Sequence, residues 1–166
     1  MNLIGHPAPL FDTPAFTPNQ EHSEVSLESL RGKWILLFFY PLDFTIVCPT
    51  EISALQEKAA EFKERNCEVI SISVDSTFSH EAWCKRDLGQ VDFIMASDIT
   101  KRISRDYGVL DEKTGVALRG THIIDPEGKV QYSLCHNLKV GRNIPEILKT
   151  LEALQTRKNC LANWQK

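Results

Sequence analysis

The chain has 166 residues, of which 42% are hydrophobic and 25% are charged, and its formal net charge is −3. That length fits one domain with a substantial core, and the composition is ordinary for a soluble globular protein. A weakly acidic chain without basic runs gives no reason to expect nucleic-acid binding.

The sequence also lacks the signals of membrane insertion and secretion. No apolar run approaches the roughly 18 residues that suggest a membrane helix. The N-terminus has no charged segment followed by an apolar stretch, which a secretory signal would have. We therefore expect a cytoplasmic protein that does not enter a membrane.

The first 30 residues contain four prolines and predict loops rather than long elements. A small hairpin could turn near Asn19 and Gln20, between residues 15–16 and 24–26. The favoured interpretation is instead a loop-rich lid packed on the rest of the domain.

An apolar run over residues 34–39 predicts a buried strand, and a helix is predicted over 49–64. Apolar residues recur in the second segment at helical spacing, which gives the helix one buried face. Cys48 therefore lies where a strand leads into a helix. Unpaired backbone N–H groups and the positive end of the helix dipole gather at such a point, and Pro49 suits a first helical position. A thiol there ionises more readily, and the thiolate is the reactive form.

The rest of the chain alternates strand and helix patterns before a final hairpin and helix. Strands are predicted at 68–74, 93–95, 117–124 and 129–135, and helices at 79–86, 100–106 and 144–154. A turn signal, Asp-Pro-Glu-Gly at 125–128, makes the last two strands a hairpin. This order predicts an α/β fold, a three-layer sandwich around a central mixed sheet, and the thioredoxin-like fold is the natural member of that class.

The segment YPLDFTIVCPTE, residues 40–51, resembles the active-site segment of the typical 2-Cys peroxiredoxins, whose bacterial members include the alkyl hydroperoxide reductase C subunits. Pro41, Thr45 and Cys48 meet the family pattern Pro-x-x-x-Thr-x-x-Cys. The resemblance runs from about residue 3 to residue 164, and it implies a thioredoxin-like fold and a thiol-dependent peroxidase. An isolated cysteine is more often buried and inert, but the length of the match favours a reactive one.

Fast reduction of a peroxide needs more than an ionised thiol. A free cysteine is about 3% ionised at pH 7, so complete ionisation gains only roughly 30-fold. The remainder must come from groups that polarise the O–O bond and hold it in line with the sulfur. The Thr45 hydroxyl and the backbone N–H groups of Val47 and Cys48 are candidates.

The resemblance also supplies an arginine and an ion-pair network around it. Residues 118–125, LRGTHIID, resemble the family strand that bears the active-site arginine, which is Arg119 in this chain. Glu51 and Arg142 resemble the residues that support that arginine, and a solvated surface pair is the alternative. His122 replaces the usual aromatic or aliphatic residue, and we expect it to be packed in the interior.

After attack on a peroxide, the sulfur becomes a sulfenic acid, which condenses with a second thiol. The tail NCLANW, residues 159–164, resembles the family's resolving segment and makes Cys160 the candidate, with Leu161 in place of the usual proline. In the family this thiol comes from the partner subunit, so the resemblance implies a homodimer, and members can form decameric rings. An unreactive tail thiol is the alternative. We divide the chain into a domain at 1–157 and a tail at 158–166.

The other three cysteines, Cys67, Cys84 and Cys135, match no catalytic position. The chain has no Cys-x-x-Cys pair and no Cys/His cluster, which argues against a thioredoxin-type dithiol and against a zinc site. We expect neither a metal nor another cofactor. In a reducing compartment such thiols are free, and a disulfide is more often catalytic than structural.

The sequence departs from eukaryotic members of the family in two places. They carry a Gly-Gly-Leu-Gly loop some way after a tryptophan, whereas Trp83 is followed here by the shorter stretch 84–89. The chain also ends six residues after Cys160, without their Tyr-Phe helix. In the resemblance both features pack over the reactive helical turn, so their absence predicts an enzyme that resists overoxidation.

The predicted function is the reduction of hydrogen peroxide and small organic hydroperoxides, with thioredoxin or a flavoprotein disulfide reductase as the electron donor. The alternative is a chaperone-like or redox-sensing assembly in which peroxide only sets the oligomeric state. A simple thioredoxin-like reductase is disfavoured by the lack of Cys-x-x-Cys.

Overall fold

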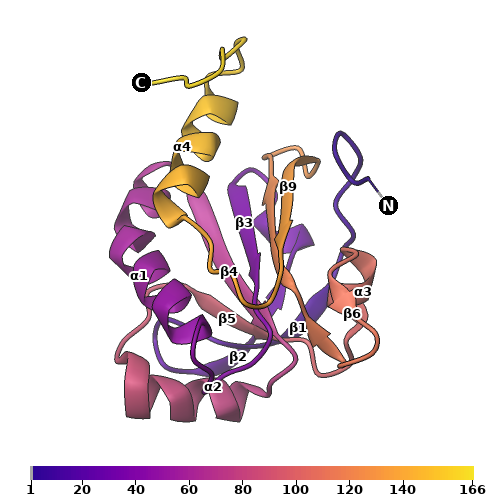
Figure 1. Ribbon diagram of the computed structural model, residues 1–166, viewed down its shortest axis with the longest axis vertical. Helices are drawn as coiled ribbons and strands as arrows, with labels where there is room; N and C mark the ends of the chain where they lie inside the picture. Colours follow the sequence, from indigo (N-terminus) through magenta and orange to yellow (C-terminus); the bar gives the residue numbers. More distant parts are fainter. Residues whose placement is uncertain (1) are drawn as a thin grey trace.

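The computed structural model describes residues 2–166 and is built around a seven-stranded mixed sheet in the order β2-β1-β5-β4-β3-β8-β9 (Figure 1). The strands of this sheet are β1 Asp12–Phe16, β2 His22–Ser26, β3 Trp34–Phe39, β4 Cys67–Ser73, β5 Ile94–Ser97, β8 Arg119–Ile124 and β9 Val130–His136. A separate two-stranded ribbon consists of β6 Leu110–Asp111 and β7 Val116–Ala117. The helices are α1 Cys48–Glu64, α2 Thr77–Trp83, α3 Arg102–Asp106 and α4 Ile144–Gln155, with a 3₁₀ turn η1 Glu28–Leu30 and a wide π turn η2 Cys84–Leu88.

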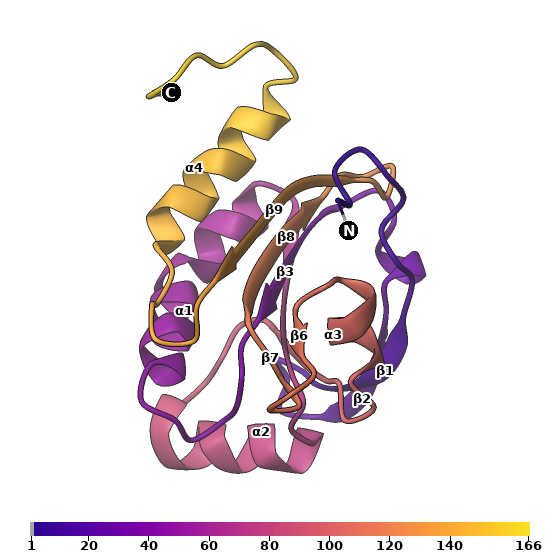
Figure 2. The same ribbon diagram turned by 45° about the vertical axis from the view of Figure 1, so that its right-hand side comes forward.

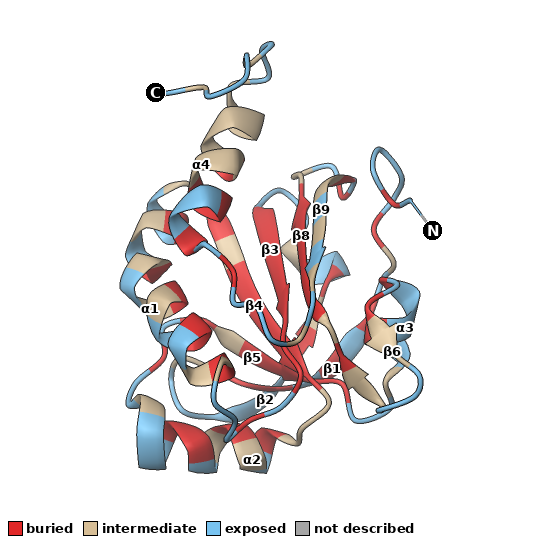
Figure 3. Ribbon diagram, viewed as in Figure 1, coloured by how far each residue is buried: buried red, intermediate tan, exposed pale blue. Residues whose placement is uncertain are grey.

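The centre of the sheet is parallel and its margins are antiparallel. Strand β4 runs parallel to β3 and β5, whereas β8 and β1 run antiparallel to the strands that they join. All six residues of β3 are buried, because helices cover both faces of the sheet (Figures 2 and 3). Leu36 and Phe38 pack toward α1 and α4, and Leu37 and Phe39 pack toward α3. The predicted three-layer α/β sandwich is therefore confirmed.

The N-terminal segment is part of the sheet, so the interpretation as a lid is wrong. The small hairpin near Asn19 and Gln20 does form, and it joins β1 to β2. Strand β1 then pairs with β5 through Ala15 and Phe16 only. Pro14, which has no backbone N–H to give, lies outside that short ladder and does not interrupt it.

Several boundaries differ from the predicted ones by one to three residues. Helix α2 begins at Thr77 rather than at 79, because the Ser76 side chain accepts a hydrogen bond from the N–H of Ser79 and caps the helix. The predicted strand 117–124 is interrupted at Leu118, where the chain passes from β7 into β8. Among residues 2–166, no helix has both the length and the apolar character needed to cross a membrane.

Candidate active site

The candidate nucleophile lies at the junction that the sequence predicts. Strand β3 ends at Phe39, residues 40–47 form a loop, and Cys48 is the first residue of α1. The side chain of Cys48 is fully buried in the same hydrophobic cluster as Ile52 and Leu55 of that helix. Burial alone disfavours a charged sulfur, so a reactive thiolate at this position requires nearby positive charge.

Arg119 supplies that charge. It is the first residue of β8, and its Nη1 lies 3.4 Å from the Sγ of Cys48. The same Nη1 donates to Glu51 Oε2 at 2.7 Å, and Nε donates to the carbonyl oxygen of Leu138 at 2.8 Å. Only 2% of Arg119 is exposed, so solvent screens its field at the sulfur very little.

Glu51 and Arg142 hold Arg119 in place. Arg142 donates to Glu51 Oε1 through its backbone N–H and its Nε, both at 2.9 Å, and to Oε2 through Nη2 at 2.9 Å. Its Nη1 donates to the carbonyl of Gly120 at 2.6 Å, and its guanidinium carbon lies 3.3 Å from the centroid of the Phe38 ring. Glu51 and Arg142 are both buried, so the alternative of a solvated surface pair is excluded.

The electrostatics of this network leave one positive charge unbalanced. Burial on its own raises the pKa of Glu51, but hydrogen bonds and charge from Arg142, followed by the charge of Arg119, outweigh it and lower that pKa. Burial lowers the pKa of Arg142, and the bond to Glu51 opposes this change. Two guanidinium groups and one carboxylate thus surround the sulfur, which is a setting that stabilises a negative charge there.

The structure does not bring the Thr45 hydroxyl to the sulfur. Thr45 is exposed, and its Oγ1 donates to the carbonyl oxygen of Leu42 at 3.1 Å, within its own loop. Pro41 is buried at the start of the same loop. At the start of α1, no group within residues 2–166 accepts the backbone N–H of Val47 or of Cys48, as expected for donors that precede the first helical hydrogen bonds.

Cys160 lies far from Cys48 in the fold. The tail leaves the end of α4 on the side of the molecule opposite the first turn of α1 (Figures 1 and 2). The Sγ of Cys160 lies 3.4 Å from the Oγ1 of Thr156 and 3.7 Å from the carbonyl oxygen of Ala153. The two thiols that the resemblance pairs are therefore not brought together within one chain.

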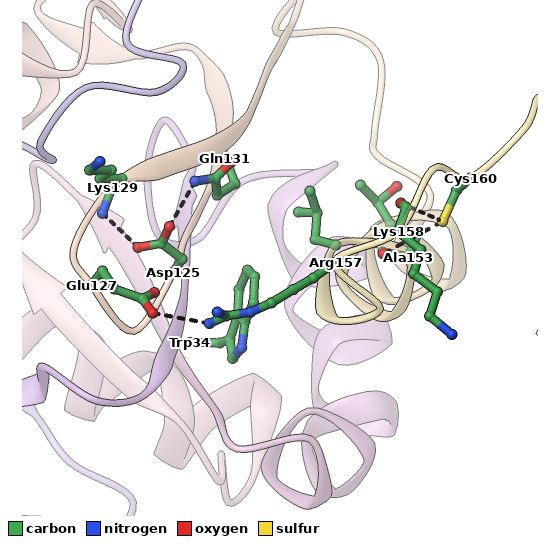
Figure 4. Close-up of a pocket in the computed structure, with 11 residues that line it drawn as sticks. Trp34, Asp125, Glu127, Lys129, Gln131, Ala153, Arg157, Lys158 and Cys160 are labelled. Carbon is green, nitrogen blue, oxygen red and sulfur yellow. Dashed lines mark hydrogen bonds and ion pairs between the residues drawn. The ribbon is translucent and has the colours of Figure 1, made fainter.

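A cavity of about 580 Å³ opens beside Cys160 (Figure 4). It lies between α4, the tail and the turn that joins β8 to β9. Across it, Arg157, the last residue of the domain, donates to Glu127 of that turn at 3.0 Å. This ion pair is exposed, and a surface pair of this kind contributes little stability.

The other three thiols are in environments that disfavour the thiolate. Burial raises the pKa of Cys67 strongly, and burial raises the pKa of Cys84 to about 11. Burial also raises the pKa of Cys135, partly offset by Arg142. In residues 2–166, no three His, Cys, Asp or Glu side chains are grouped in a way that could hold a metal ion.

Sequence reasoning gave no role to a polar cluster that holds the loop before Cys48. The Asp43 carboxylate accepts hydrogen bonds from Tyr40 Oη, Ser79 Oγ and the Nδ1 side of His80, each at 2.8 Å. The side chains of Asp43 and His80 are fully buried. Their contact joins residues 37 positions apart, so the sequence alone does not show it. The one sequence signal for this cluster was that Asp43 lies inside the active-site motif but had no role assigned to it.

The chain matches the AhpC/TSA family over residues 4–133. It is 45% identical to a protein of Clostridium pasteurianum described as a peroxiredoxin in a rubredoxin operon, across 98% of this chain and 94% of that protein. It is 50% identical to the mitochondrial thioredoxin-dependent peroxide reductase of Mus musculus, across 95% of this chain but only 64% of that protein.

Solved structures agree with this assignment. Reduced 2-Cys peroxiredoxin of Plasmodium vivax superposes with a TM-score of 0.96 at 42% identity, over 99% of this chain and 90% of that one. AhpC of Enterococcus faecalis gives a TM-score of 0.92 at 39% identity, over 97% of this chain and 100% of that one. The chain therefore belongs to the AhpC/TSA family and is a typical 2-Cys peroxiredoxin, a thioredoxin-fold enzyme that reduces peroxides with a cysteine thiol.

Proposed function

We propose that Cys48 reduces hydrogen peroxide and small organic hydroperoxides, with Arg119 as the cation that activates it. The observation that carries this assignment is the 3.4 Å contact between Arg119 Nη1 and Cys48 Sγ, made between two buried groups. The thiolate attacks one peroxide oxygen, an S–O bond forms and the O–O bond breaks. Cys48 becomes a sulfenic acid, and the other oxygen takes up a proton and leaves as water or alcohol.

In this scheme the ion-pair network fixes the direction of the Arg119 guanidinium. Its Nε is held by the carbonyl of Leu138, and Glu51 holds its Nη1 from the side of α1. A guanidinium held in this way stabilises the thiolate before the reaction and the charge that develops on the leaving oxygen during it. Arg142 balances the charge of Glu51 and leaves the charge of Arg119 for the reacting atoms.

The loop contributes the remaining proposed groups. The Thr45 hydroxyl donates a hydrogen bond to the bound peroxide. To do so it first breaks its hydrogen bond to the carbonyl oxygen of Leu42, which is 3.1 Å long. The free N–H groups of Val47 and Cys48 are further donors for a peroxide oxygen. Pro41, which is buried, shapes the start of the loop.

We further propose that the sulfenic acid is resolved by Cys160 of the partner subunit in a homodimer, which can assemble further into a decamer. Condensation of the sulfenic acid with that thiol forms one disulfide and releases water. The placement of the tail at the far end of α4 supports a bond between chains over a bond within one chain. On this proposal residues 158–166 are a functional unit distinct from the domain at 1–157.

Thioredoxin is the proposed electron donor, because several relatives are described as thioredoxin-dependent peroxide reductases. A flavoprotein disulfide reductase is the alternative donor. A coupled assay with each candidate distinguishes them, since only the true donor sustains repeated turnover. The expected cytoplasmic location stays a prediction.

Peroxide consumption by single-cysteine variants tests the assignment of Cys48. We expect Cys48→Ser to lose peroxidase activity entirely, since serine offers no thiolate. Cys135→Ser is the matched control and should retain most of the activity. Substantial turnover by Cys48→Ser would refute the assignment.

A further inference from the structure

Two sulfur atoms that take no part in the reaction of Cys48 meet where α2 and η2 pack against β5. The Sγ of Cys84, the first residue of η2, lies 3.6 Å from the Sδ of Met95 on β5. Cys84 is 7% exposed and Met95 is fully buried. A thioether sulfur is a weak hydrogen-bond acceptor, so hydrogen bonding alone is a weak reason for this contact.

His80 brings a nitrogen atom to the same place. It lies four residues before Cys84, and residues four apart share one face of a helix. Its Nε2 is turned toward β5 and lies 3.3 Å from the carbonyl oxygen of Ala96, the residue that follows Met95. The His80 side chain is fully buried. A thiol, a thioether and an imidazole nitrogen are therefore gathered between α2 and β5.

The hydrogen bonds of His80 leave a lone pair on Nε2. The Asp43 carboxylate accepts from Nδ1 at 2.8 Å, so the neutral ring carries its hydrogen on Nδ1. Nε2 is then an acceptor, and its neighbour, the carbonyl of Ala96, is an acceptor too. Within residues 2–166 no group donates to Nε2, and a buried acceptor without a donor is costly. A histidine whose other nitrogen donates to a carboxylate is the usual form of a metal ligand.

We propose that Cys84, Met95 and His80 bind one Cu(I) ion. Thiolate and thioether sulfurs are soft ligands that select Cu(I), and imidazole binds copper as well. Two sulfurs at about 2.3 Å from one ion lie about 3.8 to 4.0 Å apart at tetrahedral or trigonal angles. The observed separation of 3.6 Å is a few tenths of an ångström shorter, so a small rotation of the Met95 side chain completes the site.

The charge of the complex suits its surroundings. When Cu(I) binds, the S–H bond of Cys84 breaks, an S–Cu bond forms and the proton leaves to solvent. The thiolate and Cu(I) together carry no net charge, so the apolar neighbours Val91 and Phe93 do not oppose the complex. Zn(II) with the same single thiolate would leave a positive charge in this apolar place, which is costly. Burial therefore favours the monovalent ion over the divalent one.

The turn η2 provides the way in. Cys84 is the one ligand with any solvent exposure, so the ion reaches the site through this residue. The N–H of Gly89 donates to the carbonyl of Cys84 at 2.8 Å, five residues back rather than four, which widens the helix at the ligand. Such π turns are rare and are found frequently at functional sites.

The first test is an anaerobic titration of the reduced protein with Cu(I), in competition with the chromophoric chelator bicinchoninate. We expect wild type to hold one Cu(I) per chain about tenfold or more tighter than Met95→Leu does, since one ligand is lost. Met95→Leu keeps all five thiols, and leucine replaces methionine in a core at little cost. Cys84→Ala should lose the same binding. Cys67→Ala, which removes another buried thiol, is the matched control and should bind as wild type does.

The second test needs no variant and is independent of peroxide reduction. X-ray absorption of wild type loaded with one equivalent of Cu(I) should show two sulfurs at about 2.3 Å and one imidazole nitrogen at about 2.0 Å. A first shell without the imidazole nitrogen, or with a single sulfur, would overturn the proposal. So would a Met95→Leu protein that holds Cu(I) as tightly as wild type, or displacement of the bound Cu(I) by an equal concentration of Zn(II).

Discussion

Cys48 is a buried thiol surrounded by more positive than negative charge. Its nearest charged neighbour, Arg119, is itself buried and shares Glu51 with Arg142. A charge in such a place is costly unless it is paired and hydrogen-bonded. Both arginines therefore need the carboxylate of Glu51 as a counter-charge. Its removal should lower both the stability of the fold and the catalytic rate.

Glu51→Gln tests how much this pairing stabilises the fold. Glutamine keeps the shape of the side chain but leaves two buried guanidinium groups without a counter-charge. We expect the free energy of unfolding to fall by about 3–5 kcal/mol, measured by urea denaturation at pH 7. Glu57→Gln, an exposed position on the same helix, is the matched control and should change little. Equal stability of the two variants would contradict this account of the network.

His122 is buried among Phe39 and Tyr107, and neither of its ring nitrogens has a hydrogen-bond partner. Burial lowers its pKa to about 4, against about 6.5 in an unfolded chain. As the pH falls from about 6.5 toward 4, the unfolded state takes up a proton that the folded state does not. Folding stability should therefore fall over this range, by up to about 3 kcal/mol from this group alone.

His122→Phe should remove that part of the pH dependence. The measurement is the free energy of unfolding at pH 7 and at pH 4.5, in the wild type and in the variant. His6→Gln, which changes an exposed histidine, is the control and should keep the wild-type slope. If His122→Phe loses as much stability on acidification as the wild type does, the buried imidazole is not the cause.

Strand β8 is the element on which the site is assembled. It carries Arg119 at its first residue and Gly120 next, whose carbonyl accepts from Arg142. A Cβ added at Gly120 would lie 2.5 Å from Cγ1 of Val109, which is buried on the other face of the sheet. The strand therefore approaches the loop after α3 too closely for any side chain at this position.

Gly120→Ala should destabilise the protein by about 1–3 kcal/mol through overpacking. Val109→Ala removes the opposing methyl groups, so the double variant should be no less stable than Val109→Ala alone. Urea denaturation of the two single variants and the double variant gives the coupling energy. If the losses of unfolding free energy in the two single variants simply add in the double variant, the contact with Val109 is not what requires glycine at position 120.

The elements that were predictable are those whose signal is local. Strand β3 has the predicted residues, because a continuous apolar run buried on both faces admits few alternatives. The N-terminal hairpin was misinterpreted, since its place in the sheet depends on a partner, β5, about 80 residues further along the chain. The same distinction explains which parts of the site were predictable. Cys48 could be identified because its motif is contiguous in the sequence, whereas the hydrogen bond between Asp43 and His80 depends on tertiary structure.

At the level of the whole molecule, the first turn of α1, which begins at Cys48, and the tail, which carries Cys160, lie at opposite ends of the domain (Figure 2). A disulfide between them within a chain would require the tail to cross the length of the domain. We therefore expect peroxide to convert the protein into disulfide-linked dimers, which non-reducing electrophoresis separates from monomers. Cys160→Ser should give no such dimers, and Cys135→Ser should give them as the wild type does. A monomer with an intrachain Cys48–Cys160 bond would contradict the proposed arrangement.

The most direct test of the central claim is the rate constant for the reaction of Cys48 with peroxide in Arg119→Lys, measured by stopped flow. Lysine keeps the positive charge but cannot bind Leu138, Glu51 and the sulfur at once, as the planar guanidinium does. We expect the rate constant to fall by roughly 10²-fold or more. Arg105→Lys, at an exposed arginine paired with Glu112, should react as the wild type does. A wild-type rate in Arg119→Lys would contradict the claim that this arginine activates the thiol.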